Sequence, residues 1–216
     1  KYHSLVSCTY MYRSHDDKNR PFKGDRIAAL ARLGQEIVHA RDLGNLWQIS
    51  DRNTLYTTLT RYANKGTLFR IQKGMYALKP IDAFDPWVLG LKGLHRFAYV
   101  STETILMEHG IIAQKISAVT LISNASIRFS LGPHAYLSRK LQDAFLYNPA
   151  GIVEQKGVRV ATLARAIADL LYFNPHAYFN GARLVDWNAV RRIQNEIGYP
   201  ETPHLYATSK PKRRRA

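Results

Sequence analysis

The 216-residue sequence predicts an α+β protein with an N-terminal domain at residues 23–80 and a larger mixed domain at residues 87–209. Three observations lead to this fold class. Positive charge is concentrated near the N-terminus. Helix-like segments and then two short strand-like segments follow one another up to residue 80, and both kinds of segment are mixed beyond it. Residues 1–22 and 210–216 are predicted as an N-terminal arm and a basic tail.

The positive charge is unevenly distributed along the chain. Residues 1–80 contain 14 Lys and Arg against 6 Asp and Glu, a net +8, whereas residues 81–209 contain 12 against 10, a net +2. The tail adds 5 positive charges. Such a field attracts polyanions and speeds encounter with nucleic acid. For residues 1–80, the alternative is a basic surface without function. The tail at residues 210–216 fits a solvated end or a nuclear localisation signal equally well.

Composition bears on the cellular compartment. The hydrophobic content of 46% is normal for a globular protein. Apolar runs such as residues 119–122 are far shorter than a membrane span, and the N-terminus lacks the apolar core of a signal peptide. The single cysteine, Cys8, excludes an intrachain disulfide and fits a reducing compartment. We therefore expect a cytoplasmic protein with no membrane partner.

The first two predicted helices are short. Apolar residues at helical spacing predict a helix over residues 23–34, which Gly34 ends. The same spacing predicts a second helix over residues 36–43, with Gly44-Asn45 as its C-terminal stop.

The third helix is predicted from Asp51 to about Lys65. Asp51 is a favourable N-cap, and Gly66 is a natural stop. The helix has a stripe of apolar residues at i, i+4 and i+7, which should face the core. This stripe consists of Leu55, Leu59 and Tyr62.

A β-hairpin is predicted directly after the third helix. Residues 68–72 and 75–78 are strand-like segments joined at Lys73-Gly74. Three helices followed by a hairpin are typical of a winged helix-turn-helix, whose third helix enters the major groove of DNA. The same elements also occur in partner-binding domains, but here they coincide with the positive charge. The sequence therefore predicts a domain at residues 23–80 that binds double-stranded DNA.

The exposed side of the third helix and one face of the hairpin are the predicted DNA-binding surface. Arg can read guanine, Asn can read adenine, and the Thr methyl can contact thymine, while each Arg and Lys also suits a phosphate. Taken singly, each basic residue has the alternative of being merely solvated, and Tyr56 has the alternative of packing against the hairpin. The predicted contacts are Arg52, Asn53, Tyr56, Thr57, Arg61, Lys65, Arg70, Gln72 and Lys73, with Thr60 and Asn64 also outside the apolar stripe.

A mixed α+β domain is predicted beyond a linker-like stretch bracketed by Pro80 and Pro86. Its helices are predicted at residues 102–109, 162–172 and 185–197. Its strands are predicted at residues 97–100, 118–122, 126–131, 134–137, 152–155 and 158–161.

No catalytic or metal site is predicted in this second domain. It lacks the H-E-x-x-H, paired C-x-x-C, G-x-S-x-G and phosphate-loop patterns. Glu103, Glu108 and His109 lie near one helix without a second ligand cluster, and His109 suits the C-terminal end of that helix. Asp169 is expected to cap a loop or to pair with an arginine such as Arg165, one turn earlier, rather than to act in catalysis. We expect no enzymatic activity and no cofactor, although the scattered acids of a nuclease would leave no such pattern.

Several short motifs, in order and over both domains, resemble the abortive-infection AbiEi antitoxin family. They span roughly residues 25–175. The motifs are GTLFR at 66–70, KGMYAL at 73–78, YVSTETIL at 99–106, EHGI at 108–111, GVRVA at 157–161 and ARAIADLLY at 164–172.

This resemblance implies a transcriptional repressor that is also the antitoxin of a type IV toxin–antitoxin system used in phage defence. In that family the winged helix binds operator repeats at the promoter of its own operon. The C-terminal domain is linked to neutralising a partner toxin, AbiEii, which resembles a nucleotidyltransferase. The family's DNA contacts would fall on Arg52, Asn53, Thr57, Arg61, Arg70 and Lys73. The N-terminal arm and the basic tail depart from the family pattern.

Two other functions remain compatible with the sequence. One is a nucleic-acid-processing, nuclease-like enzyme in which the winged helix delivers the second domain to its substrate. The other is a protein–protein adaptor built on a winged helix. Assembly into an oligomer on inverted repeats of operator DNA is compatible with the repressor function.

Overall fold

The chain is an α+β protein that divides into two compact units between Pro80 and Ile81. The computed structural model describes residues 25–114, 117–155, 157–200 and 202. The predicted N-terminal arm with Cys8 and the basic tail lie outside the described residues. Within the described part of the chain, no helix combines the length and apolar character needed to cross a membrane.

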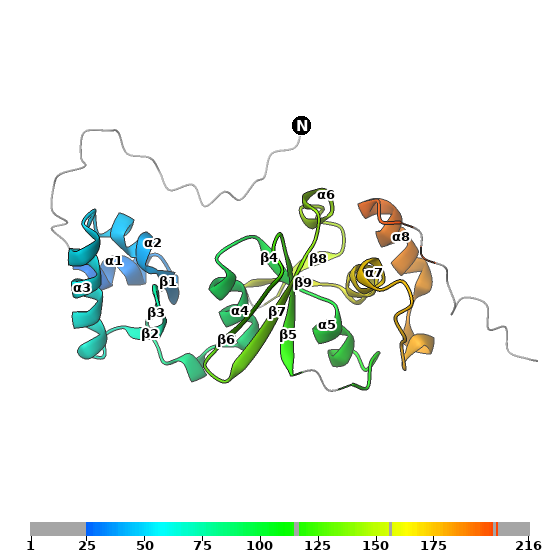
Figure 1. The fold of residues 1–216 in the computed structure, drawn as a ribbon, viewed down its shortest axis with the longest axis horizontal. Helices are drawn as coiled ribbons and strands as arrows, with labels where there is room; N and C mark the ends of the chain where they lie inside the picture. The colour runs from blue at the N-terminus through cyan, green and yellow to red at the C-terminus, as the bar shows by residue number, and fades with distance from the viewer. Residues whose placement is uncertain (1–24, 115–116, 156, 201, 203–216) are drawn as a thin grey trace, which may run out of the picture. The chain divides into compact units, whose positions relative to one another are not determined.

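In its described residues, 25–80, the first unit contains three helices and a small antiparallel sheet (Figure 1). The sheet has the strand order β1-β3-β2, so the last strand lies in the centre. Its β2–β3 hairpin turns at Lys73-Gly74, where Gly74 has a φ of 77° that suits glycine. The elements are α1 (Arg26–Arg32), β1 (Ile37–His39), α2 (Ala40–Leu46), α3 (Arg52–Asn64), β2 (Phe69–Gln72) and β3 (Met75–Ala77).

A single apolar core holds these elements together. Trp47 is fully buried at the end of α2, and its indole N–H donates to the carbonyl of Arg26 at 3.0 Å. Its ring lies 5.6 Å from that of Tyr62 on α3, so one side chain joins three helices. Leu55 and Leu59 of the predicted stripe are buried, and Tyr62 is partly buried against the same core.

The prediction of a helix over residues 36–43 is wrong. Ile37–His39 is strand β1, which pairs with β3 through Ile37↔Ala77 and His39↔Met75, and α2 starts only at Ala40. Gly44 does not stop the helix, since α2 continues to Leu46. A Cβ at Gly44 would lie 3.1 Å from a methyl carbon of Leu55, so this glycine allows α2 to approach α3 closely.

The second unit is built on a six-stranded mixed sheet with the order β6-β7-β5-β4-β9-β8. All six predicted strands and all three predicted helices are present in it, with ends that differ by a few residues. The strands are β4 (Ala98–Val100), β5 (Ala118–Ser123), β6 (Ile127–Leu131), β7 (His134–Lys140), β8 (Ile152–Gln155) and β9 (Val158–Ala161). The helices are α4 (Pro86–Leu94), α5 (Glu103–Glu108), α6 (Asp143–Leu146), α7 (Leu163–Phe173) and α8 (Trp187–Ile197), with 3₁₀ turns η1 (Ile81–Ala83) and η2 (Ala182–Leu184).

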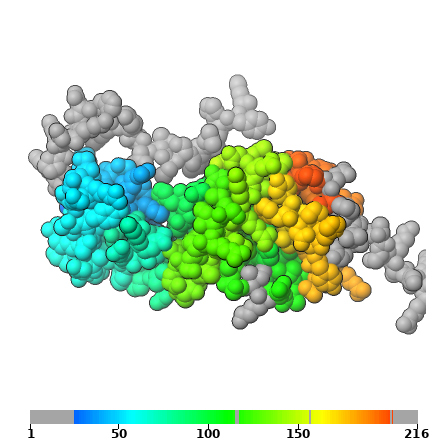
Figure 2. Space-filling model, viewed as in Figure 1, coloured from blue at the N-terminus to red at the C-terminus, as the bar shows by residue number. Residues whose placement is uncertain are grey.

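Helices cover the two faces of this sheet. Figure 1 shows α4 on one side of the strands and α5 and α7 on the other. The α8 segment packs against α7, and Figure 2 shows these yellow to orange-red segments as one continuous layer. The central strands β4 and β5 are therefore largely buried between two helical layers.

Two helices of this unit were not predicted, α4 and α6. The stretch Pro80–Pro86 was expected to be linker-like, but η1 lies within it and Phe84 is buried. Asp85 caps α4 by accepting from the N–H of Trp87 at 2.8 Å, and Pro86 is its first residue. Proline suits this position because the first helical N–H has no intrahelical partner.

Close approach of α4 to the sheet depends on Gly90. A Cβ at this position would lie 2.4 Å from the ring of Tyr136. That ring cannot easily yield, because it stacks on Phe129 at 4.9 Å and its hydroxyl donates to the carbonyl of Pro86 at 2.8 Å.

We expect Gly90→Ala to lower the free energy of unfolding of the second unit by about 1–3 kcal/mol, the usual cost of overpacking. Chemical denaturation of the full chain measures this. Ser130→Ala, at an exposed position of β6, is the matched control and should unfold as the wild type does. An unchanged unfolding midpoint for Gly90→Ala would contradict this close packing of α4.

The Arg165–Asp169 pair lies at the centre of the second unit, where neither side chain is exposed. Arg165 Nε donates to Asp169 Oδ1 at 2.9 Å, which confirms the predicted pairing. Three hydroxyl groups also donate to Asp169, at distances of 2.6–3.0 Å; they belong to Tyr99, Ser101 and Tyr199. Burial, together with the charge of Asp169, raises the pKa of Tyr99 and of Tyr199. These hydroxyls therefore stay protonated and remain donors.

Candidate nucleic-acid interface

Helix α3 is positioned by signals in its own sequence. The Asp51 carboxylate accepts from the N–H of Thr54 at 2.6 Å, and Gly66, with a φ of 69°, follows the C-cap Lys65. Hydrogen bonds from Thr54 lower the pKa of Asp51 below its ordinary value of 3.8. The cap is therefore ionised at neutral pH and is favourable at the positive N-terminal end of the helix.

Asp51 should make the stability of the first unit depend on pH. Because its pKa is lower in the folded state, its contribution is fully present above the unfolded value near 3.8 and is lost as pH falls through the folded value. We expect Asp51→Ala to lower the midpoint temperature of thermal unfolding at pH 7. The difference in this temperature between the variant and the wild type should shrink below pH 3.8. Circular dichroism melts at several pH values measure this. Asp51→Ser, which keeps a capping oxygen, should recover part of the loss.

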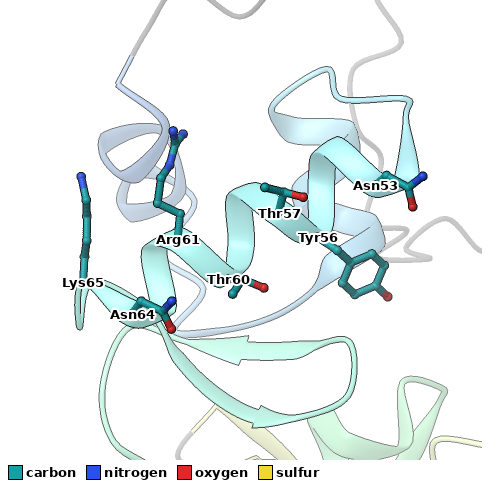
Figure 3. Close-up of a pocket in the computed structure, with 7 residues that line it drawn as sticks. All are labelled: Asn53, Tyr56, Thr57, Thr60, Arg61, Asn64 and Lys65. Atoms are coloured by element: carbon teal, nitrogen blue, oxygen red, sulfur yellow. The ribbon is translucent and has the colours of Figure 1, made fainter.

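The exposed face of α3 forms an open hollow lined by polar and basic side chains. Figure 3 shows these side chains along the length of the helix, with Arg61 and Lys65 toward its C-terminal end and Asn53 and Tyr56 toward its N-terminal end. The residues that line the hollow are Asn53, Tyr56, Thr57, Thr60, Arg61, Asn64 and Lys65.

This face has no negative charge of its own. Between Asp51 and Asp82 the sequence contains no Asp or Glu, whereas it contains six Lys and Arg. Arg52, Arg61 and Lys65 are exposed on α3. Exposed cations without neighbouring acids in sequence give a surface that attracts polyanions.

The side chain of Tyr56, on α3, lies near the hairpin and is only partly exposed. It packs against the apolar core, and a Cβ at Gly74 in the hairpin turn would lie 3.7 Å from its hydroxyl. Arg52 lies one turn earlier, with its guanidinium carbon 5.7 Å from the centre of the Tyr56 ring. Tyr56 therefore lies close to both the hairpin turn and Arg52, and it also lines the hollow.

The hairpin presents three further predicted residues, Arg70, Gln72 and Lys73, and all three are exposed. A register shift between Arg70 and Gln72 interrupts the pairing of β2 with β3. The side-chain amide of Gln72 contacts the sulfur of Met75 at 3.7 Å, so this residue has a neighbour within the hairpin itself.

The structure places five members of the predicted set on α3, Lys65 at its C-cap and the other three on the hairpin. Thr60 and Asn64, which the apolar stripe already placed outside the core, line the same hollow as Arg61. The close approach of Tyr56 to Gly74 is not readable from spacing, because it depends on how α3 and the hairpin pack.

The acids and histidine singled out in the second unit do not gather into a metal site. Glu103 forms an ion pair with Arg139, and His109 Nδ1 lies 2.9 Å from the carbonyl oxygen of Ile105 at the end of α5. Among the described residues, no group of three or more His, Cys, Asp and Glu could hold a metal ion.

Comparison with known proteins assigns no family to this chain. No family model matches the chain, and no curated protein matches it. One similar solved structure is that of the RV2827C protein from Mycobacterium tuberculosis, with 12% identity and a TM-score of 0.47. The match covers 81% of this chain and 70% of that one.

Proposed function

We propose that the first unit is a winged helix-turn-helix that binds double-stranded DNA, with α3 in the major groove and the β2–β3 hairpin as the wing. The observation that carries this proposal is the exposed, acid-free face of α3. A helix fits the major groove, and its outward side chains then meet base edges and phosphates.

The side chains on this face divide into two roles. Arg61 and Lys65, one turn apart near the end of α3, suit phosphates, because their charge releases counterions from the duplex. Asn53 and Thr57 lie nearer the start of the helix, where an amide can bind adenine and a methyl can contact thymine. On the wing, Arg70 and Lys73 supply further cations for the backbone.

We propose further that the protein is a repressor and antitoxin of the AbiEi type. The support is the resemblance of its motifs, several of which coincide with the buried centre of the second unit, including Tyr99, Arg165 and Asp169. In this proposal, the first unit occupies operator repeats at its own promoter, and the second neutralises a nucleotidyltransferase-like toxin in the cytoplasm. No catalytic step is assigned to the chain.

Footprinting of the full chain on DNA upstream of its own reading frame tests the repressor function. We expect protection of repeated half-sites about one helical turn apart, and binding that weakens as salt rises. Cleavage of plasmid DNA in the presence of Mg²⁺ would favour the nuclease-like alternative. Failure to bind any duplex at any salt concentration would favour the adaptor.

Co-expression tests the antitoxin function separately. A nucleotidyltransferase-like product of a neighbouring reading frame should arrest growth, and this chain should restore it. The variant Arg52→Ala plus Arg61→Ala is the matched control, because it should lose DNA binding and still restore growth. Growth arrest that this chain does not relieve would contradict the antitoxin proposal.

A further inference from the structure

A cleft of about 270 Å³ lies in the second unit. It is formed by the end of α4, the start of β4 and the β8–β9 hairpin. Three cationic residues from three of these segments line it: Lys92, Arg96 and Arg159. One carboxylate, that of Glu154, also lines it, so the formal charge of the described lining is positive.

Two cations of this cleft, Arg96 and Arg159, have close neighbours. Arg96 donates to the side-chain oxygen of Asn124 at 3.0 Å and to the carbonyl of Leu94 at 3.4 Å. Arg159 lies opposite Glu154 in the register of β9 and β8. Binding an anion here would cost less side-chain entropy than binding it to freely moving surface residues.

An aromatic surface continues from the cleft through Arg159. The Arg159 guanidinium carbon lies 4.6 Å from the centre of the Phe97 ring, and the Phe97 ring lies 5.0 Å from that of Tyr147. Tyr147 is 53% exposed, so its ring is accessible to a ligand. The order along the surface is therefore an exposed ring, a half-buried ring and then cations.

We propose that this surface binds an unpaired nucleotide, with the base stacked on Tyr147 and the phosphate in the cleft beside Arg96 and Arg159. Every base offers an aromatic face, and stacking on a protein ring together with a cationic groove for the backbone is how unpaired nucleic acid is bound. The Glu154 carboxylate can accept a hydrogen bond from a sugar hydroxyl or a base amino group. The ligand chemistry is shared by a free nucleotide and by a single strand.

The test uses the full chain carrying Arg52→Ala and Arg61→Ala, so that binding by the first unit does not contribute. The probes are a ten-nucleotide single strand with a central 2-aminopurine, whose fluorescence falls on stacking, and ATP as the free nucleotide. In this background Tyr147→Ala should weaken binding of at least one probe about tenfold, and Tyr147→Trp should retain it. Arg159→Gln should weaken binding and reduce its salt dependence.

The matched control is Tyr178→Ala, because Tyr178 is also an exposed aromatic of this unit, at 70%. Loss of ATP binding in the Tyr147 variant identifies a free nucleotide as the source, and loss of strand binding alone identifies single-stranded nucleic acid. Equal affinities for the Tyr147 and Tyr178 alanine variants, or no binding of either probe, would overturn the proposal. Neither outcome depends on whether α3 binds a duplex.

Discussion

Replacing Asp169 with alanine is expected to lower the free energy of unfolding of the second unit by about 3–5 kcal/mol, the usual cost of removing one partner from a buried ion pair. The Arg165 guanidinium would remain fully buried without its counter-ion. The hydroxyls of Tyr99, Ser101 and Tyr199 would also lose the acceptor that they share. Typical domains have only about 5–15 kcal/mol of stability, so this change should leave the unit marginal.

Urea unfolding of the full chain, followed by circular dichroism and by tryptophan fluorescence, measures this effect. Arg192→Ala is the matched control, because Arg192 pairs with Asp186 at 3.9 Å on the exposed surface, where a pair contributes about 0–1 kcal/mol. The double variant Arg165→Met plus Asp169→Leu should recover only the part of the loss that comes from the unpaired Arg165 charge, because the three hydroxyls still lack their acceptor. An Asp169→Ala protein as stable as the Arg192→Ala protein would contradict this account.

Replacing Arg52 and Arg61 with alanine together is expected to weaken duplex DNA binding at least tenfold, or about 1.4 kcal/mol. Both side chains are exposed on α3 and lie in the acid-free part of the sequence. If each neutralises one phosphate, the slope of log affinity against log salt should also become shallower by about 1.8. Fluorescence anisotropy with an operator duplex at several salt concentrations measures both quantities.

The control for this prediction removes the same charge elsewhere. Arg183→Ala plus Arg191→Ala removes two exposed cations from the second unit and should leave duplex affinity within about twofold of the wild type. Circular dichroism confirms that both double variants are folded. A folded Arg52, Arg61 double variant with an unchanged binding isotherm would show that α3 is not the DNA-binding helix.

The two units differ in how far the sequence predicted the surfaces proposed here to bind nucleic acid. On α3, the cap at Asp51, the stripe through Leu55 and Leu59 and the stop at Gly66 are all local, so the helix and its outward face followed from them. In the second unit, Phe97, Tyr147 and Arg159 come from distant parts of the chain. Their contact depends on the sheet that places the starts of β4 and β9 side by side, and no spacing in the sequence indicates it.

The wrong prediction of a helix at residues 36–43 also arises from a contact between distant parts of the chain. Ile37, Ala40 and Leu43 have helical spacing, yet Ile37–His39 became a strand because β3, almost 40 residues later, offers it backbone partners. Three residues have little helical preference of their own, so a tertiary hydrogen-bonding partner outweighs it.

By itself, the sequence determined the α+β class, the ends of α3 and the set of polar and basic side chains on its exposed face. Those features depend on periodicity, capping and charge, which act over one or two helical turns. Only the tertiary structure decided that β1 is a strand, that Asp169 receives four hydrogen bonds, and that Tyr56 lies close to Gly74 in the hairpin turn. Each of these depends on groups far apart in the chain, and burial within a packed core sets which of them meet.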